Sequence, residues 1–313
     1  MRDVQQQLFS GGLSGLATTV SLQPFDLLKT RLQQGDGLTG VPKSGSSIVL
    51  RTTREVVSEH GLRGLWRGTV PSLIRNVPGV ALYMTSLTQL RGFMATSSHF
   101  TSVQQHRTAS GRNVNASVLP TLSMQGNLMA GATTRVAVGF LLNPFSVLKA
   151  RFESNIYAYD SFCGALISIA RQGPSELLRG FMASSLRDAP YAGLFVVFYE
   201  AIKKESTLLL PPSSAQESTL LHGVSAASAG AIVTLITHPF DVVKTKLQIR
   251  TEDRYGGFVR CVRTIWQQRG ITGYFDGASL RLSRKVLSSA IGWAVYEGIL
   301  IVFRPRWSSG SDG

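Results

Sequence analysis

Cysteine and acidic residues are scarce in this sequence, and charged residues as a whole are few. Only two of the 313 residues are cysteine, Cys163 and Cys261, and their wide separation excludes a disulfide framework and does not match zinc-ligand spacing. Charged residues make up 16% of the chain, against about 25% in typical soluble proteins. With 43% hydrophobic residues, the composition also excludes a disordered chain. Lysine and arginine (32) outnumber the 18 acidic residues, which suggests a nucleic-acid partner or an anionic membrane, and the low charged fraction favours the membrane.

A catalytic constellation is also missing from the sequence. It contains no paired nucleophile and base, no metal-ligand cluster and no phosphate-binding loop, so we expect neither an enzyme nor a bound metal or cofactor. His222 and His238 border an apolar run and are better explained as helix-end residues. The N-terminal residues show no cleavage site typical of a targeting peptide. A nucleic-acid-binding protein would explain the net charge but not the long uncharged runs, so we expect no nucleic-acid partner.

Long uncharged runs are what the sequence does contain. Three of them are close to the roughly 20 residues that an α-helix needs to cross a bilayer: 4–25, 113–134 and 218–240. Three shorter runs alternate with them, flanked by arginine and lysine side chains that can reach the interface: 76–90, 189–199 and 286–296. A short run standing alone would instead indicate a core helix of a soluble protein.

Each long run ends in the same phrase, so the chain contains an internal repeat. The phrase combines a proline, a phenylalanine and two basic positions, with an acid in two of the three copies. The copies are Pro24-Phe25-Asp26-Leu27-Leu28-Lys29-Thr30-Arg31, Pro144-Phe145-Ser146-Val147-Leu148-Lys149-Ala150-Arg151 and Pro239-Phe240-Asp241-Val242-Val243-Lys244-Thr245-Lys246.

A second phrase, ending in glycine, follows each copy of the first. Its copies are Trp66-Arg67-Gly68, Leu178-Arg179-Gly180 and Phe275-Asp276-Gly277. Each unit is therefore expected to contribute a long helix, a basic connector and a short helix. The expected divisions are repeat 1 at 5–94, a polar loop at 95–118, repeat 2 at 119–206, a linker at 207–217, repeat 3 at 218–304 and a tail at 305–313.

The three connectors carry much of the positive charge. Seven basic residues fall in 29–67, four in 149–179 and seven in 244–269, whereas the loops 92–118 and 203–217 have two each. By the positive-inside tendency, the connectors share the face toward the more negative compartment. Amphipathic stretches at 48–58 and 258–268 predict short helices on that face.

The repeated phrases are similar to those of the mitochondrial carrier family, and the likeness covers roughly residues 8–303. The resemblance implies an all-α membrane protein of the mitochondrial inner membrane, with six transmembrane helices in three pseudo-symmetric two-helix repeats and short matrix helices around a central cavity. It also implies transport by alternating access, a monomer, and lipid, cardiolipin above all, at the N-termini of the matrix helices.

The same resemblance implies a gate at the matrix face. An acid and a lysine three residues apart lie on one face of a helix end and can pair with a neighbouring repeat. The expected arrangement is Asp26 with Lys149, Asp241 with Lys29, and Ser146 opposite Lys244, where no ion pair can form. The residues expected to brace the gate or to bend the helices are Gln33, Gln248, Pro24, Pro144 and Pro239, and Glu153 departs from the bracing pattern. Ordinary interfacial charges are the alternative.

A second gate is expected at the opposite face, where the family's phrase is degraded. Its members here are Arg91, Glu200, Lys203 and Glu297, and only Glu297 with Arg91 is expected to pair. Since this gate has fewer ion pairs than the matrix gate, we expect the empty carrier to rest open away from the basic face.

The substrate positions implied by the family are Arg75, Arg187, Asp188, Arg284 and Lys285, and Arg135 replaces a small residue in a long run. An arginine beside an aspartate suits a zwitterion, which offers a carboxylate to one and an ammonium to the other. This pattern favours an amino acid over a nucleotide or phosphate. Two alternatives stay open: Arg187 and Asp188 neutralise each other structurally, and Arg135 is a structural partner of an acid or carbonyl.

Further details resemble the branch of the family that carries glycine for haem biosynthesis. They are Lys149-Ala150-Arg151-Phe152-Glu153-Ser154, Tyr157, Tyr159, Leu186-Arg187-Asp188-Ala189-Pro190, Asn76-Val77-Pro78-Gly79-Val80-Ala81-Leu82-Tyr83 and Arg135. The resemblance implies import of glycine into the matrix, where it supplies 5-aminolevulinate and haem synthesis. Another small amino acid such as serine, or a non-transporting membrane scaffold, remains the alternative.

Overall fold

The fold is described from a computed structural model of the chain. The structure describes residues 2–35, 45–96, 123–157, 159, 161–209 and 215–303. The predicted tail at 305–313 and most of the predicted loop at 95–118 and linker at 207–217 lie outside these residues. Within the described ranges every regular element is helical and no strand occurs, as the predicted all-α class requires.

Long helices, two of them continued by a shorter helix after a break, alternate with connector helices along the chain. The long ones are α1 (Arg2–Gln34), α3 (Thr69–Ala95), α4 (Met124–Leu141), α8 (Phe181–Leu209), α9 (Ala215–Ile236) and α12 (Ala278–Phe303); α5 (Asn143–Glu153) follows the break after α4, and α10 (His238–Ile249) follows the break after α9. The connectors contain α2 (Gly45–His60), η1 (Leu62–Trp66), α6 (Phe162–Arg171), α7 (Pro174–Leu177), η3 (Asp253–Tyr255), α11 (Phe258–Arg269) and η4 (Gly270–Phe275). The short connector helices predicted at 48–58 and 258–268 are present as α2 and α11.

The second helix of each repeat is longer than the sequence predicts. The expected short helices were bounded by uncharged runs of about a dozen residues, whereas α3, α8 and α12 have 27, 29 and 26 residues. The helices continue past the basic residues that flank each uncharged run, and Arg75, Arg187 and Arg284 lie inside them, as the predicted substrate positions require.

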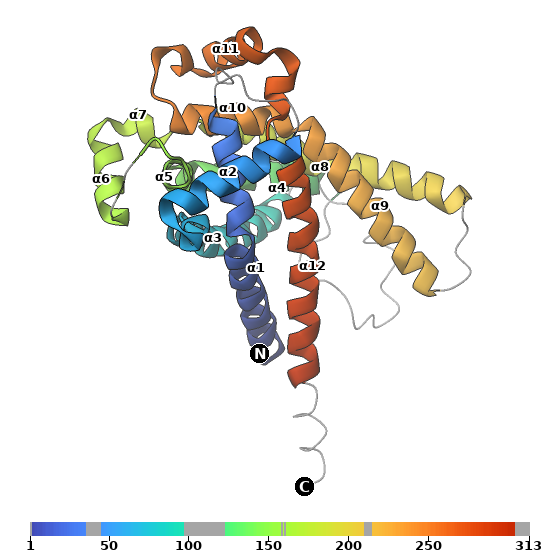
Figure 1. The fold of residues 1–313 in the computed structure, drawn as a ribbon. Coiled ribbons are helices and arrows are strands. Elements are labelled where there is room, and N and C mark those ends of the chain that lie inside the picture. Colours follow the sequence, from blue (N-terminus) through green and yellow to red (C-terminus); the bar gives the residue numbers. More distant parts are fainter. Residues whose placement is uncertain are drawn as a thin grey trace. The chain divides into compact units, whose positions relative to one another are not determined.

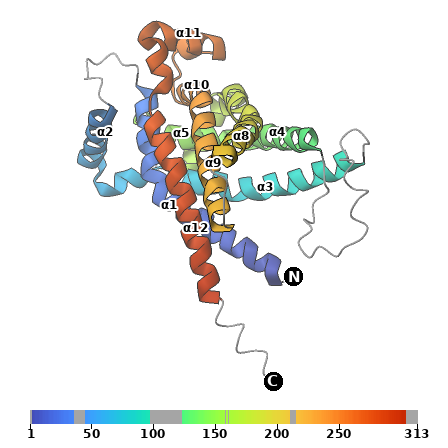
Figure 2. The same cartoon turned by 90° about the vertical axis from the view of Figure 1, so that its right-hand side faces the viewer.

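The described chain forms two compact units. Unit 1 comprises Met1–Val77, Pro144–Gly180 and Val242–Gly313, and unit 2 comprises Pro78–Asn143 and Phe181–Asp241. In unit 1, α1 packs along α12, and the two helices lie side by side in Figures 1 and 2. In unit 2, α8 packs against both α4 and α9.

The apolar core of unit 1 lies where the connector helices cover the helix ends. Leu27 and Leu28 of α1 pack with Val56 of α2 and Leu280 of α12. A second cluster joins α5 to α6 through buried aliphatic side chains: Val147, Leu148, Ala165 and Ile169. The connectors thus hold the charged helix ends in fixed positions by burying apolar surface.

The helix is interrupted near the proline of the first phrase in repeats 2 and 3 but not in repeat 1. A proline inside a helix cannot donate a hydrogen bond to the carbonyl four residues earlier. The helix breaks at Leu142 shortly before Pro144 and at Thr237 shortly before Pro239, but α1 continues through Pro24. The carbonyl that Pro24 leaves without its helical donor belongs to Val20, and it accepts a 2.9 Å hydrogen bond from Trp66 Nε1.

The length and hydropathy of a helix determine whether it can cross a bilayer alone. No single helix among the described residues is long and apolar enough to cross a membrane. One interrupted pair, Leu221–Ile236 followed by His238–Ile249, meets the requirement jointly by length and composition.

Candidate functional site

The ends of α1, α5 and α10 form a closed ring of contacts in unit 1. The last carbonyls of a helix have no partner within the helix and carry partial negative charge, so they favour a basic donor. The second basic residue of each repeated phrase supplies one to the next repeat: Arg31 Nε to Glu153 O at 2.9 Å, Arg151 Nε to Gln248 O at 3.1 Å, and Lys246 Nζ to Gly35 O at 2.6 Å. The ring therefore closes from repeat 1 to 2, 2 to 3 and 3 to 1.

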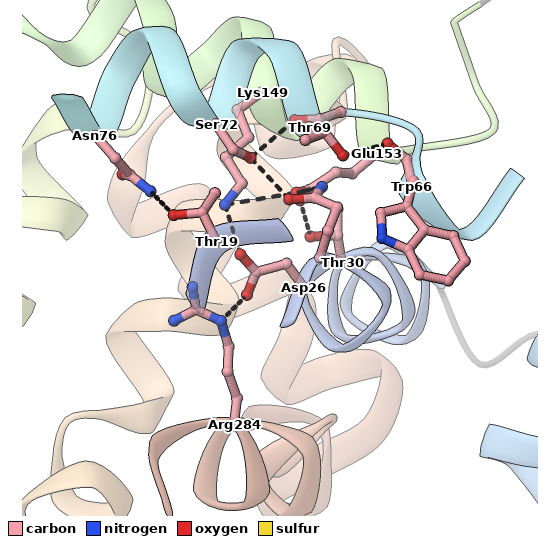
Figure 3. Close-up of polar contacts among 12 residues, drawn as sticks. Thr19, Asp26, Thr30, Trp66, Thr69, Ser72, Asn76, Lys149, Glu153 and Arg284 are labelled. Carbon is pink, nitrogen blue, oxygen red and sulfur yellow. Dashed lines mark hydrogen bonds and ion pairs between the residues drawn. The ribbon is translucent and has the colours of Figure 1, made fainter. Parts of the chain in front are cut away.

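A row of alternating charges lies beside this ring. Lys149 Nζ is 2.6 Å from Asp26 Oδ2, so the expected contact between these residues is present (Figure 3). Arg284 of α12 binds the other oxygen of Asp26, and Glu153 Oε1 lies 3.6 Å from Lys149 Nζ. The order Arg284, Asp26, Lys149, Glu153 balances two cations with two carboxylates, which is what charges withdrawn from water require. That these residues act as a gate stays a prediction.

The two bracing glutamines share one mode of binding. Gln33 Nε2 donates to the carbonyl of Asp276 at 3.3 Å, and Gln248 Nε2 donates to that of Arg179 at 3.4 Å. Both carbonyls immediately precede the glycine of the second phrase. Thr245 also donates to Gln33 Oε1 at 2.7 Å, which fixes the orientation of that amide.

The close contact with the bracing side chain of a neighbouring repeat, together with the backbone conformation, explains why the second phrase ends in glycine. Gly68, Gly180 and Gly277 have φ angles of +89°, +73° and +75°, which favour glycine. A Cβ on Gly68 would lie 2.9 Å from Glu153 Cγ, and one on Gly180 would lie 2.9 Å from Gln248 Cγ. The phrase that the sequence repeats is thus a turn on which the neighbouring repeat rests its bracing side chain.

Gln23 is a functional candidate that sequence analysis missed. Its Nε2 donates to the carbonyl of Arg67 at 3.1 Å and to Glu153 Oε1 at 3.0 Å, and its Oε1 accepts a hydrogen bond from Ser72 at 3.0 Å. Because an ionised Glu153 cannot donate to the Arg67 carbonyl as a glutamine would, Gln23 supplies that hydrogen bond. The signal in the sequence is an amide directly before Pro24, in a chain whose second repeat has Glu153 in place of the bracing glutamine.

The other residues expected at this gate are distributed as follows. Ser146 and Lys244 are buried in α5 and α10, and Lys29 lies in α1, all in unit 1. Asp241 belongs to unit 2, so its pairing with Lys29 stays a prediction.

Unit 2 contains a charged cluster around Arg187. Its Nε and Nη2 bind the two oxygens of Asp188 at 2.7 and 2.9 Å, and its Nη1 binds Asp241 Oδ1 at 2.7 Å. The Asp241 side chain is 2% exposed, whereas that of Asp188 is 33% exposed. The arginine therefore binds two carboxylates, and Asp188 is the more accessible of the two.

Arg187 and Arg284 occupy equivalent positions and make equivalent contacts. Each stands seven residues after the glycine of its own repeat, and each binds the aspartate in the first phrase of the following repeat. Arg75 is the third member of this set, and the equivalent residue in the following repeat is Ser146, which bears no charge.

The remaining predicted substrate residues do not gather in one unit. Arg135 of α4 lies in unit 2 with its guanidinium 5.0 Å from the centre of the Tyr83 ring. Arg75 and Lys285 lie in α3 and α12 within unit 1. The convergence of the six predicted residues on one cavity therefore stays a prediction.

The gate expected at the opposite face is described only in part. Arg91 lies in α3, and Glu200 and Lys203 lie in α8, where Lys203 Nζ is 5.9 Å from the centre of the Tyr199 ring. The side chain of Glu297 lies outside the described residues, so its pairing with Arg91 stays a prediction. Among the residues the structure describes, no group of three or more potential metal ligands occurs.

Three helical repeats joined by a ring of basic side chains on helix-end carbonyls, with arginines inside long, largely apolar helices, are typical of a membrane transporter. The sequence matches the mitochondrial carrier protein family over residues 2–98, 120–207 and 215–306. The chain belongs to the mitochondrial carrier protein family. It is thus a multi-pass protein of the mitochondrial inner membrane and a transporter rather than an enzyme.

Three fungal relatives bear the name mitochondrial glycine transporter. The one from Laccaria bicolor is 71% identical over 306 residues, which cover 97% of this chain and 99% of the relative. Those from Aspergillus niger and Aspergillus fumigatus are 43% and 41% identical, each over 96% of this chain and over 91% and 94% of the relative.

Proposed function

We propose that this protein imports glycine into the mitochondrial matrix by alternating access and so supplies 5-aminolevulinate and haem synthesis. The relatives named for glycine transport support the substrate, since one of them is 71% identical over almost its whole length. The observation that carries the proposal is the charged cluster that Arg187 forms with the accessible Asp188 and the buried Asp241. Such a cluster is costly in an apolar helix unless it has a function.

The chemistry of this cluster fits a zwitterion. The glycine carboxylate would replace Asp188 on Arg187, so that the number of charge-assisted hydrogen bonds to the guanidinium is kept. Asp188, released from Arg187, would then bind the glycine ammonium. Asp241 would stay on Arg187, because its side chain is almost fully buried whereas Asp188 is one-third exposed. Arg75, Arg135, Arg284 and Lys285 are proposed to complete the site.

The proposed architecture has three repeats, 5–94, 119–206 and 218–304, with six transmembrane segments. The segments are α1, α3, α4 with α5, α8, α9 with α10, and α12. The ring at the basic end supports a conformation closed toward the matrix. Asp26, Lys29, Lys149, Asp241 and Lys244 form the proposed matrix gate, and binding of substrate shifts the balance between the two gates.

Two further parts of the proposal concern the surroundings of the carrier. Cardiolipin would bind at the N-termini of the connector helices α2, α6 and α11. The carrier would work as a monomer, because the three repeats close their ring of contacts within one chain.

Uptake of radiolabelled glycine into liposomes tests the function. The wild type should take up glycine in preference to serine, and the variants Arg187→Ala and Asp188→Ala should lose uptake while still inserting into the bilayer. Preference for serine would reassign the substrate. Lack of uptake of any amino acid by correctly folded protein would favour a scaffold built on the carrier fold.

A control substitution distinguishes loss of the binding site from a general loss of folded protein. Arg51 forms an i,i+4 ion pair with Glu55 at 2.9 Å on the exposed side of α2, outside the proposed site. Arg51→Ala therefore removes an arginine and an ion pair away from the ring of helix ends. Loss of uptake in Arg51→Ala equal to that in Arg187→Ala would contradict a specific role for Arg187.

A further inference from the structure

Glu153 is the buried acid that the proposed mechanism does not use. It stands where repeats 1 and 3 carry a bracing glutamine, and its side chain is 3% exposed. We propose that Glu153 is a positioning residue, a second acid that holds Lys149 when the gate opens and Asp26 withdraws. This inference rests on the proposed gate function of Lys149 and Asp26.

The two acids that face Lys149 differ in how they are attached. Asp26 belongs to α1 and lies 2.6 Å from Lys149 Nζ. Glu153 belongs to α5, as Lys149 does, and lies 3.6 Å away at a spacing of four residues. When the helices move apart, the contact with Asp26 must lengthen. The contact with Glu153 is set by the geometry of a single helix and is retained.

Lys149 and Glu153 depend on each other in the open gate. In the closed ring Glu153 also accepts hydrogen bonds from Thr30 at 2.7 Å and from Gln23 at 3.0 Å, and both donors lie in α1. Withdrawal of α1 removes these donors together with Asp26. The lysine and the glutamate then remain as each other's partner, so that neither is left as an unpaired charge in an apolar environment.

Comparison of the three helix ends shows why this acid is needed in repeat 2. In α1, Asp26 lies three residues before Lys29, and in α10, Asp241 lies three residues before Lys244. Each first basic residue therefore has an acid within one turn of its own helix. In α5 the corresponding position is Ser146, and the acid is found instead four residues after Lys149, as Glu153. Glu153 restores the intrahelical partner that Ser146 cannot provide.

The test moves the acid from one position to the other. We expect Glu153→Gln to lower the maximal rate of glycine uptake about tenfold with little change in KM, a size typical of coupled charged neighbours. In the double variant Ser146→Asp with Glu153→Gln, an acid stands three residues before Lys149, and the rate should return to within about threefold of the wild type. An unchanged rate in Glu153→Gln, or no recovery in the double variant, would overturn the inference.

A control acid shows whether recovery is specific. Glu176 of α7, in the connector that follows α5, binds Arg151 at 2.5 Å, and its side chain is 20% exposed. Loss of uptake in Glu176→Gln should not be restored by Ser146→Asp, and equal recovery would count against the inference. If Glu153→Gln does not fold, the double variant alone decides the question. Folding and glycine uptake by the double variant would support relocation of the acid, and failure of the double variant to fold or to transport would contradict it. A wild type without glycine uptake refutes the proposed function instead.

Discussion

The helix ends of repeats 1 and 2 perform the same structural task with different residues. In α1 the acid, the hydroxyl and the bracing amide are Asp26, Thr30 and Gln33, and the equivalent residues of α5 are Ser146, Ala150 and Glu153. Both ends nevertheless close the ring through a basic residue that caps the next helix. In both repeats the first lysine of the phrase thus has a carboxylate about one turn away on its own helix, before it in α1 and after it in α5.

The same two repeats differ in how they accommodate proline. Repeat 1 keeps α1 continuous because the Trp66 indole donates to the Val20 carbonyl that Pro24 leaves without its helical donor. The equivalent residue in repeat 2 is Leu178, which has no donor, and the helix breaks between α4 and α5. The indole nitrogen of Trp66 is thus a donor to the helix at its proline that repeat 2 lacks at the equivalent position.

The largest effect is expected at Lys149, which lies near Asp26 of repeat 1 and Glu153 of repeat 2. Lys149→Met would remove the cation that lies between Asp26 and Glu153. Removing one partner of a buried ion pair costs about 3–5 kcal/mol. We expect a large loss of thermal stability and no measurable uptake. Lys204, an exposed lysine of α8, provides the control, and Lys204→Met should behave as the wild type.

A smaller effect is expected at the glycine turns. Gly68 rests on Glu153 of repeat 2, and Gly277 rests more loosely on α1, with the nearest atom, Lys29 Cγ, 3.4 Å from an added Cβ. Both Gly→Ala substitutions meet a left-handed backbone, which costs about 1–2 kcal/mol. Gly68→Ala should lower the unfolding temperature further because it adds the 2.9 Å contact with Glu153 Cγ. Equal shifts in thermal unfolding would contradict the tighter packing on Glu153.

Trp66→Phe tests the difference at the prolines. The substitution keeps an aromatic ring but removes the donor to Val20, which should cost about 1 kcal/mol. Leu178→Phe in repeat 2 removes no hydrogen bond and serves as the matched control. Amide hydrogen exchange around Pro24 should accelerate only in Trp66→Phe, and unchanged exchange would show that the indole does not stabilise the continuous helix.

The smallest effect concerns the two cysteines of the connector helices. Burial raises the pKa of the Cys261 thiol to about 12 even though Lys246 and Arg179 act in the opposite direction. The pKa of the thiol in an unfolded chain is about 8.5. Above that pH the unfolded state releases a proton that the folded state keeps. Stability should therefore fall as pH rises above that value, and Cys261→Ala should reduce this slope in thermal unfolding. Maleimide should label the exposed Cys163 and spare Cys261 in folded protein.

Sequence patterns could predict contacts that depend on equivalent positions in the repeats. The contact of Asp26 with Lys149 and the connector helices α2 and α11 were predicted in this way. The contacts of Gln23 and Trp66 could not be found from the repeat, because each side chain donates to a backbone carbonyl that lies 44 or 46 residues away in sequence. Glu153 was recognised as an exception to the bracing pattern, but its contact with Lys149 was not predicted, because the phrase placed the acid before the lysine.

The caps between repeats also determine when the protein can complete its fold during synthesis. Arg31 needs the carbonyl of Glu153, and the Gly35 carbonyl at the end of the first helix needs Lys246. Since α1 is synthesised before α5 and α10, its end can be completed only after those helices have been made. A chain interrupted after two repeats would lack Lys246, so the Gly35 carbonyl would lose that donor.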